Sequence, residues 1–265
     1  MQLNKENYHS IETNKEYMSV SQFKSFLPQY NGCEAKAMAK LNGEWEDGDN
    51  PVFLLGSYVH AWNEGTLQEF IADTPELYKK DGTLYAKYVI GDDMINTLKD
   101  DTVAMTALEG QKETIITAEI FGIPWKVMID SLSREKEAFT DLKTTRDIYK
   151  TYWNEDTRER ENFIIHWGYD IQMAIYAEAE RTDRKGEDYY IPHIVAVSKE
   201  DPPDKELIIM PRQDIIPILN QIEPFIPHIY EVWQGKVEPQ RCGKCDYCRD
   251  SKVIKEAVHY LKVGL

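Results

Sequence analysis

The chain has 265 residues, of which 42% are hydrophobic and 29% charged, and its formal net charge is −15. This balance is typical of a globular protein and excludes wholesale disorder. No run of 18 apolar residues occurs and the first residues lack an apolar signal core, so we expect an intracellular protein without a membrane span. The negative charge argues against a polyanionic partner on average, because DNA binding depends on Lys and Arg, but a groove can be locally basic.

The first part of the chain is predicted to be mainly helical. Residues 1–17 are polar and are expected to be poorly anchored. Ser19 and Gln22 fit a capping box that begins a helix, and Pro28 ends it. Further helices and loops are predicted at 34–41 (helix), 43–51 (loop), 52–70 (helix) and 71–110 (helix with loops).

From residue 114 the pattern changes to short strands that alternate with helices. Strands are predicted at 114–121, 125–130, 138–143, 189–198 and 206–211. Helices are predicted at 148–181 with a polar break near 154–161, at 214–234 with three prolines that can split it, and at 252–261. This order indicates one α/β domain with a central mixed β-sheet flanked by helices.

Two aspartates and a lysine form the strongest internal signal for chemistry. Asp130 and Asp141 lie among strand-type residues, and Lys143 follows Asp141 by one strand period. Two carboxylates at the ends of adjacent strands can hold one hard cation, and an ammonium beside them can meet developing negative charge. This combination is what phosphodiester hydrolysis needs. The alternative interpretation is a solvated strand edge that carries charge.

His60, Gln172 and Tyr176 are weaker candidates. Imidazole is a common metal ligand, and Gly56, four residues before His60, permits a close backbone approach. Gln172 and Tyr176 share one helix face at i, i+4 spacing. Taken alone, each is as well explained by a half-buried polar residue or by surface polarity beside a core tyrosine.

Three charged residues near the strands are minor candidates. Glu119 is a candidate to contact the metal ligands without binding the metal itself. Arg146 and Lys150 are candidates to face DNA phosphates, although a solvated helix face explains them equally well.

All four cysteines are candidates for one metal site. Cys33 stands alone, whereas Cys242, Cys245 and Cys248 form a Cys-x2-Cys-x2-Cys run. In an intracellular protein this spacing indicates metal or cluster ligation rather than disulfides. Three clustered thiols leave a tetrahedral site one ligand short, so we expect Cys33 to come within reach. Four thiolates suit either zinc or an iron–sulfur cluster, and the spacing does not separate them.

In chain order, these pieces resemble one family. Gly56-x3-His60, Gly122…Asp130, Asp141-Leu-Lys143 and Gln172-x3-Tyr176 are similar to the PD-(D/E)XK nucleases of the RecB-like group, most of all to phage exonucleases of the exodeoxyribonuclease VIII (RecE) type. The run Ser19-x-Ser21-x4-Phe26 before Cys33 is similar to cluster-bearing members, including CRISPR adaptation nucleases and AddB-type helicase–nucleases. The resemblance covers roughly residues 18–250. Ile129 replaces the proline of the family name, and the last cysteine gap is shorter than in cluster-bearing relatives.

The resemblance implies a restriction-endonuclease-like core over residues 18–265, with a cysteine segment at 242–248, and it implies a role for each candidate residue. The implied catalytic set comprises the metal ligands His60, Asp130, Asp141 and the Leu142 carbonyl, the water-activating Lys143, and the site-shaping Gln172 and Tyr176. The metal would be Mg²⁺ or Mn²⁺. The implied ligands of a 4Fe–4S cluster, with Zn²⁺ as the alternative, are Cys33, Cys242, Cys245 and Cys248.

The function that the resemblance implies is a metal-dependent, phage-type deoxyribonuclease that resects duplex DNA ends for recombination. The implied partners are linear duplex ends, further copies of the chain and a single-strand annealing protein, in the cytoplasm of a phage- or prophage-bearing cell. The alternative is a non-catalytic nucleic-acid-binding or recombination-accessory module built around a structural metal. The order of the strands and acids fixes only the hydrolytic class; exonuclease action and the choice of DNA follow from the family.

Overall fold

A computed structural model describes residues 3–48, 51–81, 83–155, 157–254, 256–257 and 259–262. Its centre is a five-stranded sheet in the order β1-β2-β3-β6-β7. The strands are β1 (Gln111–Ile120), β2 (Ile123–Ser133), β3 (Ala138–Thr145), β6 (Ile191–Ser198) and β7 (Lys205–Ile209). Only β3 and β6 pair in parallel among these neighbours, so the sheet is mixed, as predicted.

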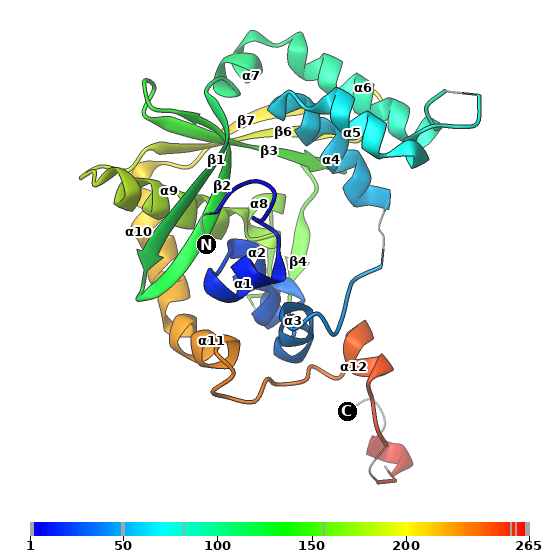
Figure 1. The fold of residues 1–265 in the computed structure, drawn as a ribbon, viewed down its shortest axis with the longest axis vertical. Coiled ribbons are helices and arrows are strands. Elements are labelled where there is room, and N and C mark those ends of the chain that lie inside the picture. The colour runs from blue at the N-terminus through cyan, green and yellow to red at the C-terminus, as the bar shows by residue number, and fades with distance from the viewer. Residues whose placement is uncertain are drawn as a thin grey trace.

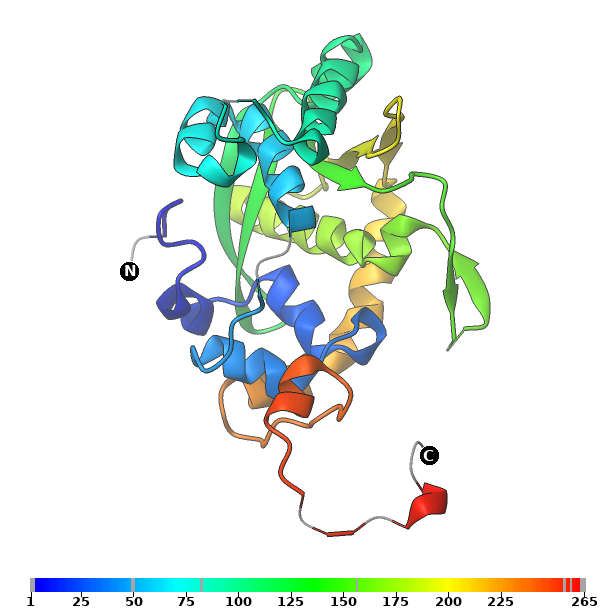
Figure 2. The same ribbon diagram turned by 90° about the vertical axis from the view of Figure 1, so that its right-hand side faces the viewer.

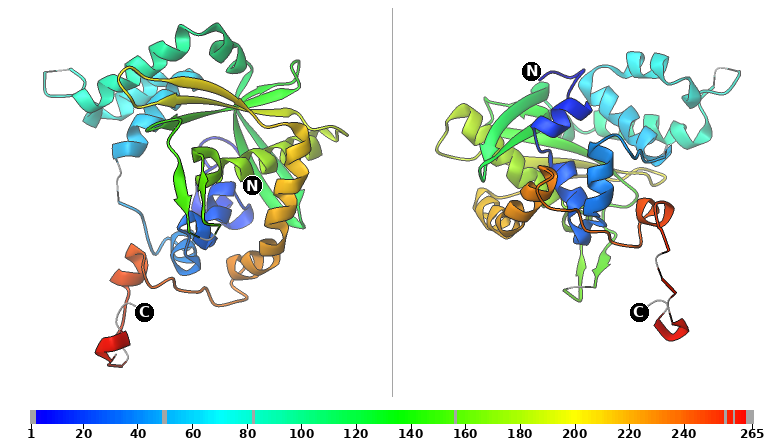
Figure 3. Two further views of the ribbon diagram at one scale, coloured as in Figure 1. Left: turned by 180° about the vertical axis from the view of Figure 1, so that it is seen from behind. Right: turned by 60° about the horizontal axis from the view of Figure 1, so that its bottom comes forward.

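Helices cover both faces of this sheet (Figure 1). One face carries α9 (Tyr169–Arg184), which contacts β1, β2 and β6, and α10 (Arg212–Ile222) packs across α9, as the view from behind shows (Figure 3). The other face is covered by α4 (Pro51–Glu64), α6 (Ala86–Lys99) and α7 (Thr102–Ala107). The fold is therefore three layers with the sheet in the middle.

The side chains of β3 alternate between two apolar clusters, one on each face. Phe139 belongs to the cluster under α9 and α10, whereas Leu142 belongs to the cluster under α4 and α6. The same alternation continues on β6, where Ile194 and Val195 belong to different clusters. Successive side chains of a strand point to opposite faces, so β3 is packed against an apolar cluster on each side. This packing fixes the position of the strand between Phe139 and Lys143.

Of the remaining elements, α5 lies beside α4 and α6, whereas α1, α2, α3, α11 and α12 lie at the end of the sheet away from α6 and α7 (Figure 1). The helices are α1 (Ile11–Glu16), α2 (Val20–Phe26), α3 (Glu34–Leu41), α5 (Leu67–Asp73), α8 (Phe163–His166), α11 (Ile226–Trp233) and α12 (Asp246–Asp250). Short 3-10 turns lie at Pro28–Tyr30, Pro75–Leu77, Glu223–Phe225 and Tyr260–Lys262. In the described part of the chain, no helix is long and apolar enough to cross a membrane.

The predicted start and end of α2 and the predicted split of 214–234 are confirmed, whereas the helix predicted over 52–70 is interrupted. Ser19 and Gln22 form the expected capping box, and α2 ends before Pro28. The predicted helix over 52–70 breaks at Gly65, which has a φ of 89°. The helix predicted over 214–234 is split into α10 and α11 by the turn at Glu223–Phe225. The loop predicted at 43–51 includes residues 49 and 50, which lie outside the described residues.

Two predicted helices are wrong. The first part of 148–181 contains a hairpin of β4 (Tyr152–Asn154) and β5 (Glu159–Glu161), which projects from the body (Figure 2). The Tyr152 ring stacks on the His166 ring, with 4.0 Å between the ring centres, and this contact holds the hairpin against α8. At the C-terminal end, residues 252–254 are not helical and lead away from the body. Val253 and Ile254 are exposed there, and a short helix without a packed face is marginal in water.

The N-terminal segment is anchored, contrary to the expectation for residues 1–17. Tyr8 and Thr13 are buried, and α1 begins at a side-chain cap. Lys126 on β2 explains this order: its Nζ donates to Tyr8 O at 2.5 Å, Thr13 Oγ1 at 3.0 Å and Asn14 Oδ1 at 2.7 Å. A buried ammonium needs acceptors, and this segment supplies them.

Candidate active site and cysteine site

The two candidate aspartates lie where β2 and β3 part. The two strands pair from Ser133↔Ala138 only as far as Ser131↔Thr140. Beyond that point the Leu142 N–H donates to Asp130 Oδ2 at 2.7 Å, so a side chain takes the place of the next backbone partner. The split exposes the carboxylates of adjacent strands to a common space, as the sequence predicts.

Asp141 is nearly fully buried, and its two oxygens have different partners. Its Oδ1 accepts a hydrogen bond from Gln172 Nε2 at 2.6 Å. Its Oδ2 lies 2.6 Å from Lys143 Nζ in an ion pair, yet it accepts no well-oriented hydrogen bond from any described residue. A buried carboxylate oxygen with free acceptor capacity suits a cation, and an oxygen-rich donor set suits a hard divalent ion such as Mg²⁺ or Mn²⁺.

His60 reaches this site from α4. Its Nδ1 lies 3.4 Å from Asp130 Oδ2. The close approach depends on Gly56, because a Cβ at this position would lie 3.3 Å from Thr144 Oγ1 on β3. The glycine one helical turn before the histidine therefore allows α4 to lie against the strand that carries Asp141.

The charges of the site are strongly coupled. Burial and the neighbouring Asp141 raise the pKa of Asp130, whereas His60 and Lys143 act in the opposite direction. Burial works against the charge on Lys143, but the attraction of Asp141 and Asp130 outweighs it and raises the lysine pKa. The ammonium also lies 4.6 Å from the centre of the Tyr169 ring. Lys143 is therefore held as a cation at neutral pH.

A cavity of about 180 Å³ opens beside these groups. Asp130, Asp141, Lys143, Gln172 and Tyr176 all line it, together with residues of the N-terminal segment and α2. Burial raises the pKa of the Tyr176 phenol, which stays protonated. His60 is not part of the lining and joins the site only through Asp130.

Glu113 lies closer to the acids than the predicted Glu119. Glu119 is exposed and pairs with Pro124 near the β1–β2 turn. Glu113 stands between two pairs of the β1–β2 ladder, Lys112↔Ser131 and Thr114↔Ile129, and so lies opposite Asp130. Burial first, and then Asp130, raise the pKa of Glu113 to about 7. Once the register of the β1–β2 hairpin is known, counting residues back from its turn at Gly122 places Glu113 opposite Asp130.

Lys24 and Tyr169 near Lys143 were not recognised from the sequence. Lys24 Nζ donates to Trp167 O at 2.8 Å, and burial and repulsion by Lys143 lower its pKa to about 8. Both residues come from helices whose packing depends on the tertiary structure. The predicted DNA contacts Arg146 and Lys150 are exposed just beyond β3, and their role stays a prediction.

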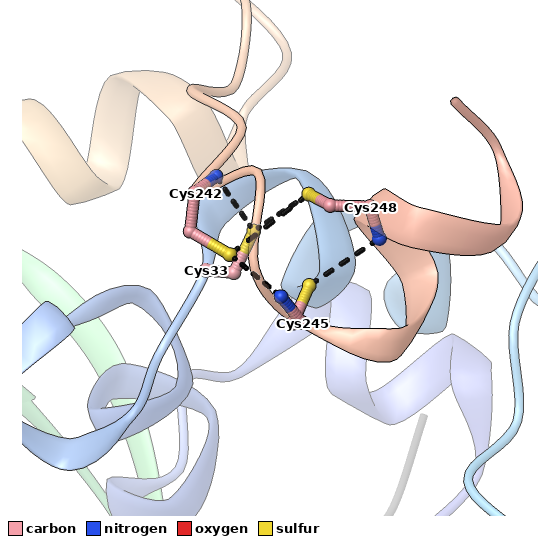
Figure 4. A group of neighbouring side chains, drawn as sticks. All are labelled: Cys33, Cys242, Cys245 and Cys248. Atoms are coloured by element: carbon pink, nitrogen blue, oxygen red, sulfur yellow. Dashed lines mark hydrogen bonds between the residues drawn. The ribbon is translucent and has the colours of Figure 1, made fainter. Parts of the chain in front are cut away.

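The four cysteines converge at the surface between α3 and α12 (Figure 4). All four Sγ atoms lie within 4.8 Å of one another, as the ligand count predicts for Cys33. Cys33 and Cys248 are buried, whereas Cys242 is exposed. In the described residues this is the only group of three or more His, Cys, Asp or Glu whose ligand atoms lie this close together. The ligand atoms of His60, Asp130 and Asp141 are spread more widely.

A mixed sheet with an acid pair at the split between its second and third strands defines a restriction-endonuclease-like α/β protein. Residues 19–251 match a family model described as a PDDEXK-like domain of unknown function, and the chain belongs to this PD-(D/E)XK family.

One solved structure agrees over the whole chain. It is the crystal structure of a "putative exonuclease" from Eubacterium rectale, with 38% identity, a TM-score of 0.92 and complete coverage of both chains. A second structure, of SSO0001, is 15% identical over 76% of this chain and 94% of its own. Its TM-score of 0.24 is too low to indicate a shared fold. No curated protein matches the chain.

Proposed function

We propose that the protein is a metal-dependent deoxyribonuclease that acts as an exonuclease on the ends of linear duplex DNA. Membership of the PD-(D/E)XK family supports the nuclease class, and a full-length structural relative named as an exonuclease supports the mode of action. The family match over 19–251 supports one nuclease domain from residue 18 onward. The observation that carries the proposal is the buried Asp141 Oδ2, which pairs with Lys143 and still has acceptor capacity.

The residues present fit one divalent cation at the strand split. Asp130, Asp141 and the Leu142 carbonyl would supply oxygen ligands, and His60 would supply a nitrogen. When bound, Mg²⁺ or Mn²⁺ polarises the phosphate and lowers the pKa of a coordinated water. Gln172 holds Asp141 in one orientation through its 2.6 Å hydrogen bond, which fixes the direction of the free carboxylate oxygen.

Lys143 acts as a cation in this proposal. Its raised pKa keeps Nζ protonated, so it orients the attacking water and meets the negative charge that develops on the phosphate oxygens. The water oxygen would form the new bond to phosphorus and pass its proton to bulk solvent, the bond from phosphorus to the 3′ oxygen would break, and that oxygen would take a proton from solvent. Asp141, 2.6 Å from Nζ, holds the ammonium in place.

DNA would approach over a locally positive mouth despite the net charge of −15. Lys143 and Lys24 lie at the site, and Arg146 and Lys150 are exposed beyond β3. Phosphate contacts of this kind release counterions, so binding should weaken steeply as salt is added. Binding to duplex DNA that does not respond to salt would contradict this part of the proposal.

Digestion of linear duplex DNA labelled at the 5′ or the 3′ end, with and without Mg²⁺, tests the proposal directly. We expect metal-dependent release of label from one end and no digestion of closed circular DNA. Lys143→Ala should lose most of its activity, and Lys236→Ala, at an exposed position beyond α11, should retain activity. DNA binding without any cleavage would favour the non-catalytic module, and cleavage of the closed circle would favour an endonuclease.

The recombination setting rests on the resemblance alone. It implies a phage or prophage origin, self-association and a single-strand annealing protein as partner. The molar mass in solution tests self-association. Co-purification with a candidate annealing protein tests the proposed partner.

A further inference from the structure

The cysteine site has the dimensions of a single coordinated ion. The Sγ atoms of Cys33 and Cys248 lie 3.6 Å apart, and those of Cys242 and Cys248 lie 3.9 Å apart. Four sulfurs at the corners of a tetrahedron around zinc, each about 2.3 Å from the metal, are about 3.8 Å from one another. The observed separations agree with this edge length.

Backbone N–H groups point at the sulfurs in a regular pattern (Figure 4). Cys242 Sγ accepts from the N–H groups of Lys244 at 3.5 Å and Cys245 at 3.3 Å, and Cys245 Sγ accepts from the N–H of Cys248 at 3.4 Å. Gly243, with a φ of 73°, lets the chain turn back on itself between the first two cysteines. Donors aimed at sulfur favour the thiolate form, which is the form that binds a metal.

The fourth ligand comes from the other end of the chain. Cys33 precedes α3, and its Sγ accepts from the N–H of Cys242 at 3.5 Å. Two hydrogen bonds hold the same two segments together: Ala35 N donates to the backbone oxygen of Gln240 at 3.1 Å, and Gln240 N donates to the side-chain Oε2 of Glu34 at 2.8 Å. The sulfurs are therefore positioned by backbone contacts on both sides.

A 4Fe–4S cluster, which the family resemblance implies, does not fit this arrangement. In such a cluster each cysteine binds a different iron at a corner of a cube, so the four sulfurs must stand further apart than around one ion. Here all four lie within 4.8 Å of one another, and two pairs are below 4 Å apart.

We propose that Cys33, Cys242, Cys245 and Cys248 bind one zinc ion in a closed tetrahedral site. Four thiolates fill all the positions of the ion, so the site has a structural rather than a catalytic role. The apolar cluster here contains only Cys33, Ala35 and Cys248 as buried members. The C-terminal segment buries few apolar side chains of its own, so the bonds to zinc would hold it against α3.

Metal analysis of the full chain tests this proposal without reference to nuclease activity. Protein is purified anaerobically from cells supplied with both iron and zinc, and zinc, iron and acid-labile sulfide are measured together with the visible spectrum. We expect a colourless protein with one zinc per chain and no labile sulfide. Iron with sulfide and broad visible absorption would overturn the proposal, as would one iron without sulfide or a protein with no bound metal.

Variants separate this site from the catalytic one. Cys245→Ser should lose zinc, whereas Asp141→Asn should keep it, so failure of the nuclease proposal leaves the zinc result unaffected. If the cysteine variant does not fold, Co²⁺ exchange into the wild-type chain still decides the question. Tetrahedral thiolate coordination then gives strong visible absorption that added zinc removes, and the absence of such absorption would overturn the proposal.

Discussion

The strand split and the cysteine site are two ligand sets built in opposite ways. The acids at the split are buried within the sheet, and Asp141 Oδ2 keeps acceptor capacity beyond its ion pair with Lys143. The cysteines lie at the surface, all within 4.8 Å, and their sulfurs already receive backbone donors. An open set leaves room for water and substrate beside a metal, whereas a closed set only joins chain segments. The two proposals therefore assign the chemistry to the oxygens and the local stability to the sulfurs.

The largest expected effect is on the rate of DNA cleavage, which should depend on the strand split and not on the cysteine site. Lys143→Ala should reduce cleavage of linear duplex DNA by roughly 10²- to 10³-fold or more, because the ammonium stabilises charge that exists only in the transition state. DNA and metal affinity should change little. Asp141→Asn should abolish cleavage and also weaken Mg²⁺ binding, measured by calorimetry. Near-normal turnover of Lys143→Ala would remove the lysine from the mechanism. Asp183→Asn, at an exposed position on α9, serves as the matched acidic control.

Removal of the cysteine-bound metal should act on stability instead. Cys33→Ser should lower the local free energy of opening of residues 236–251 by on the order of 4 kcal/mol, since loss of a metal ranks among the most destabilising single changes. Hydrogen exchange should rise in this segment and around α3, while exchange in β3 and β6 stays slow. Uniform loss of protection would show that the site supports the whole fold, and unchanged exchange would show that no metal holds it.

The sequence predicted which residues come together at each site better than it predicted their surroundings. Asp130, Asp141 and Lys143 follow strand periodicity, and the capping box at Ser19 is local, so both were accessible from the sequence. The place of Glu113 depends on the β1–β2 register, which a sequence alone does not fix.

The errors have a common physical cause. The hairpin at 152–161 and the anchored N-terminal segment depend on contacts with distant residues: Tyr152 on His166, and Lys126 with Tyr8. Tertiary contacts of this kind override local polarity, because they satisfy buried groups that local patterns do not reveal. The four cysteine positions gave the ligand count, but the choice of ion required the distances between sulfurs.

Lys126→Met tests what holds the N-terminal wall of the open site. The change removes three hydrogen bonds to the segment that contains Tyr8, Thr13 and Asn14, and it should cost about 1–3 kcal/mol in local stability. Hydrogen exchange of residues 3–16 should rise.

Lys112→Met is the matched control for this change. Lys112 also donates to three oxygens, but these belong to Asn63, Leu108 and Ser131 rather than to the N-terminal segment. Increased exchange at residues 3–16 in both variants would mean that the loss of any buried lysine loosens the protein, and that Lys126 has no special role in the wall.

The smallest effect concerns Glu113 and the pH dependence of stability. The pKa of this carboxyl is about 7 in the folded protein and 4.5 in the unfolded chain, because of burial and the nearby Asp130. The folded state keeps the proton where the unfolded state has lost it, so the contribution of Glu113 is fully present below pH 4.5 and is lost as the pH rises through 7. Glu113→Gln should therefore raise the melting temperature at pH 8 by a few degrees at most, and the gain should vanish towards pH 4.5.

Added Mg²⁺ should reduce this gain, because a cation at the acid pair offsets the repulsion from Asp130. Glu119→Gln, at an exposed position on the same strand, should show the same small difference from wild type at every pH. A Glu113→Gln gain that is constant with pH would place Glu113 outside the electrostatic field of the acids. A gain that is unchanged by Mg²⁺ would mean that burial of the Glu113 carboxyl, and not repulsion from Asp130, accounts for its raised pKa.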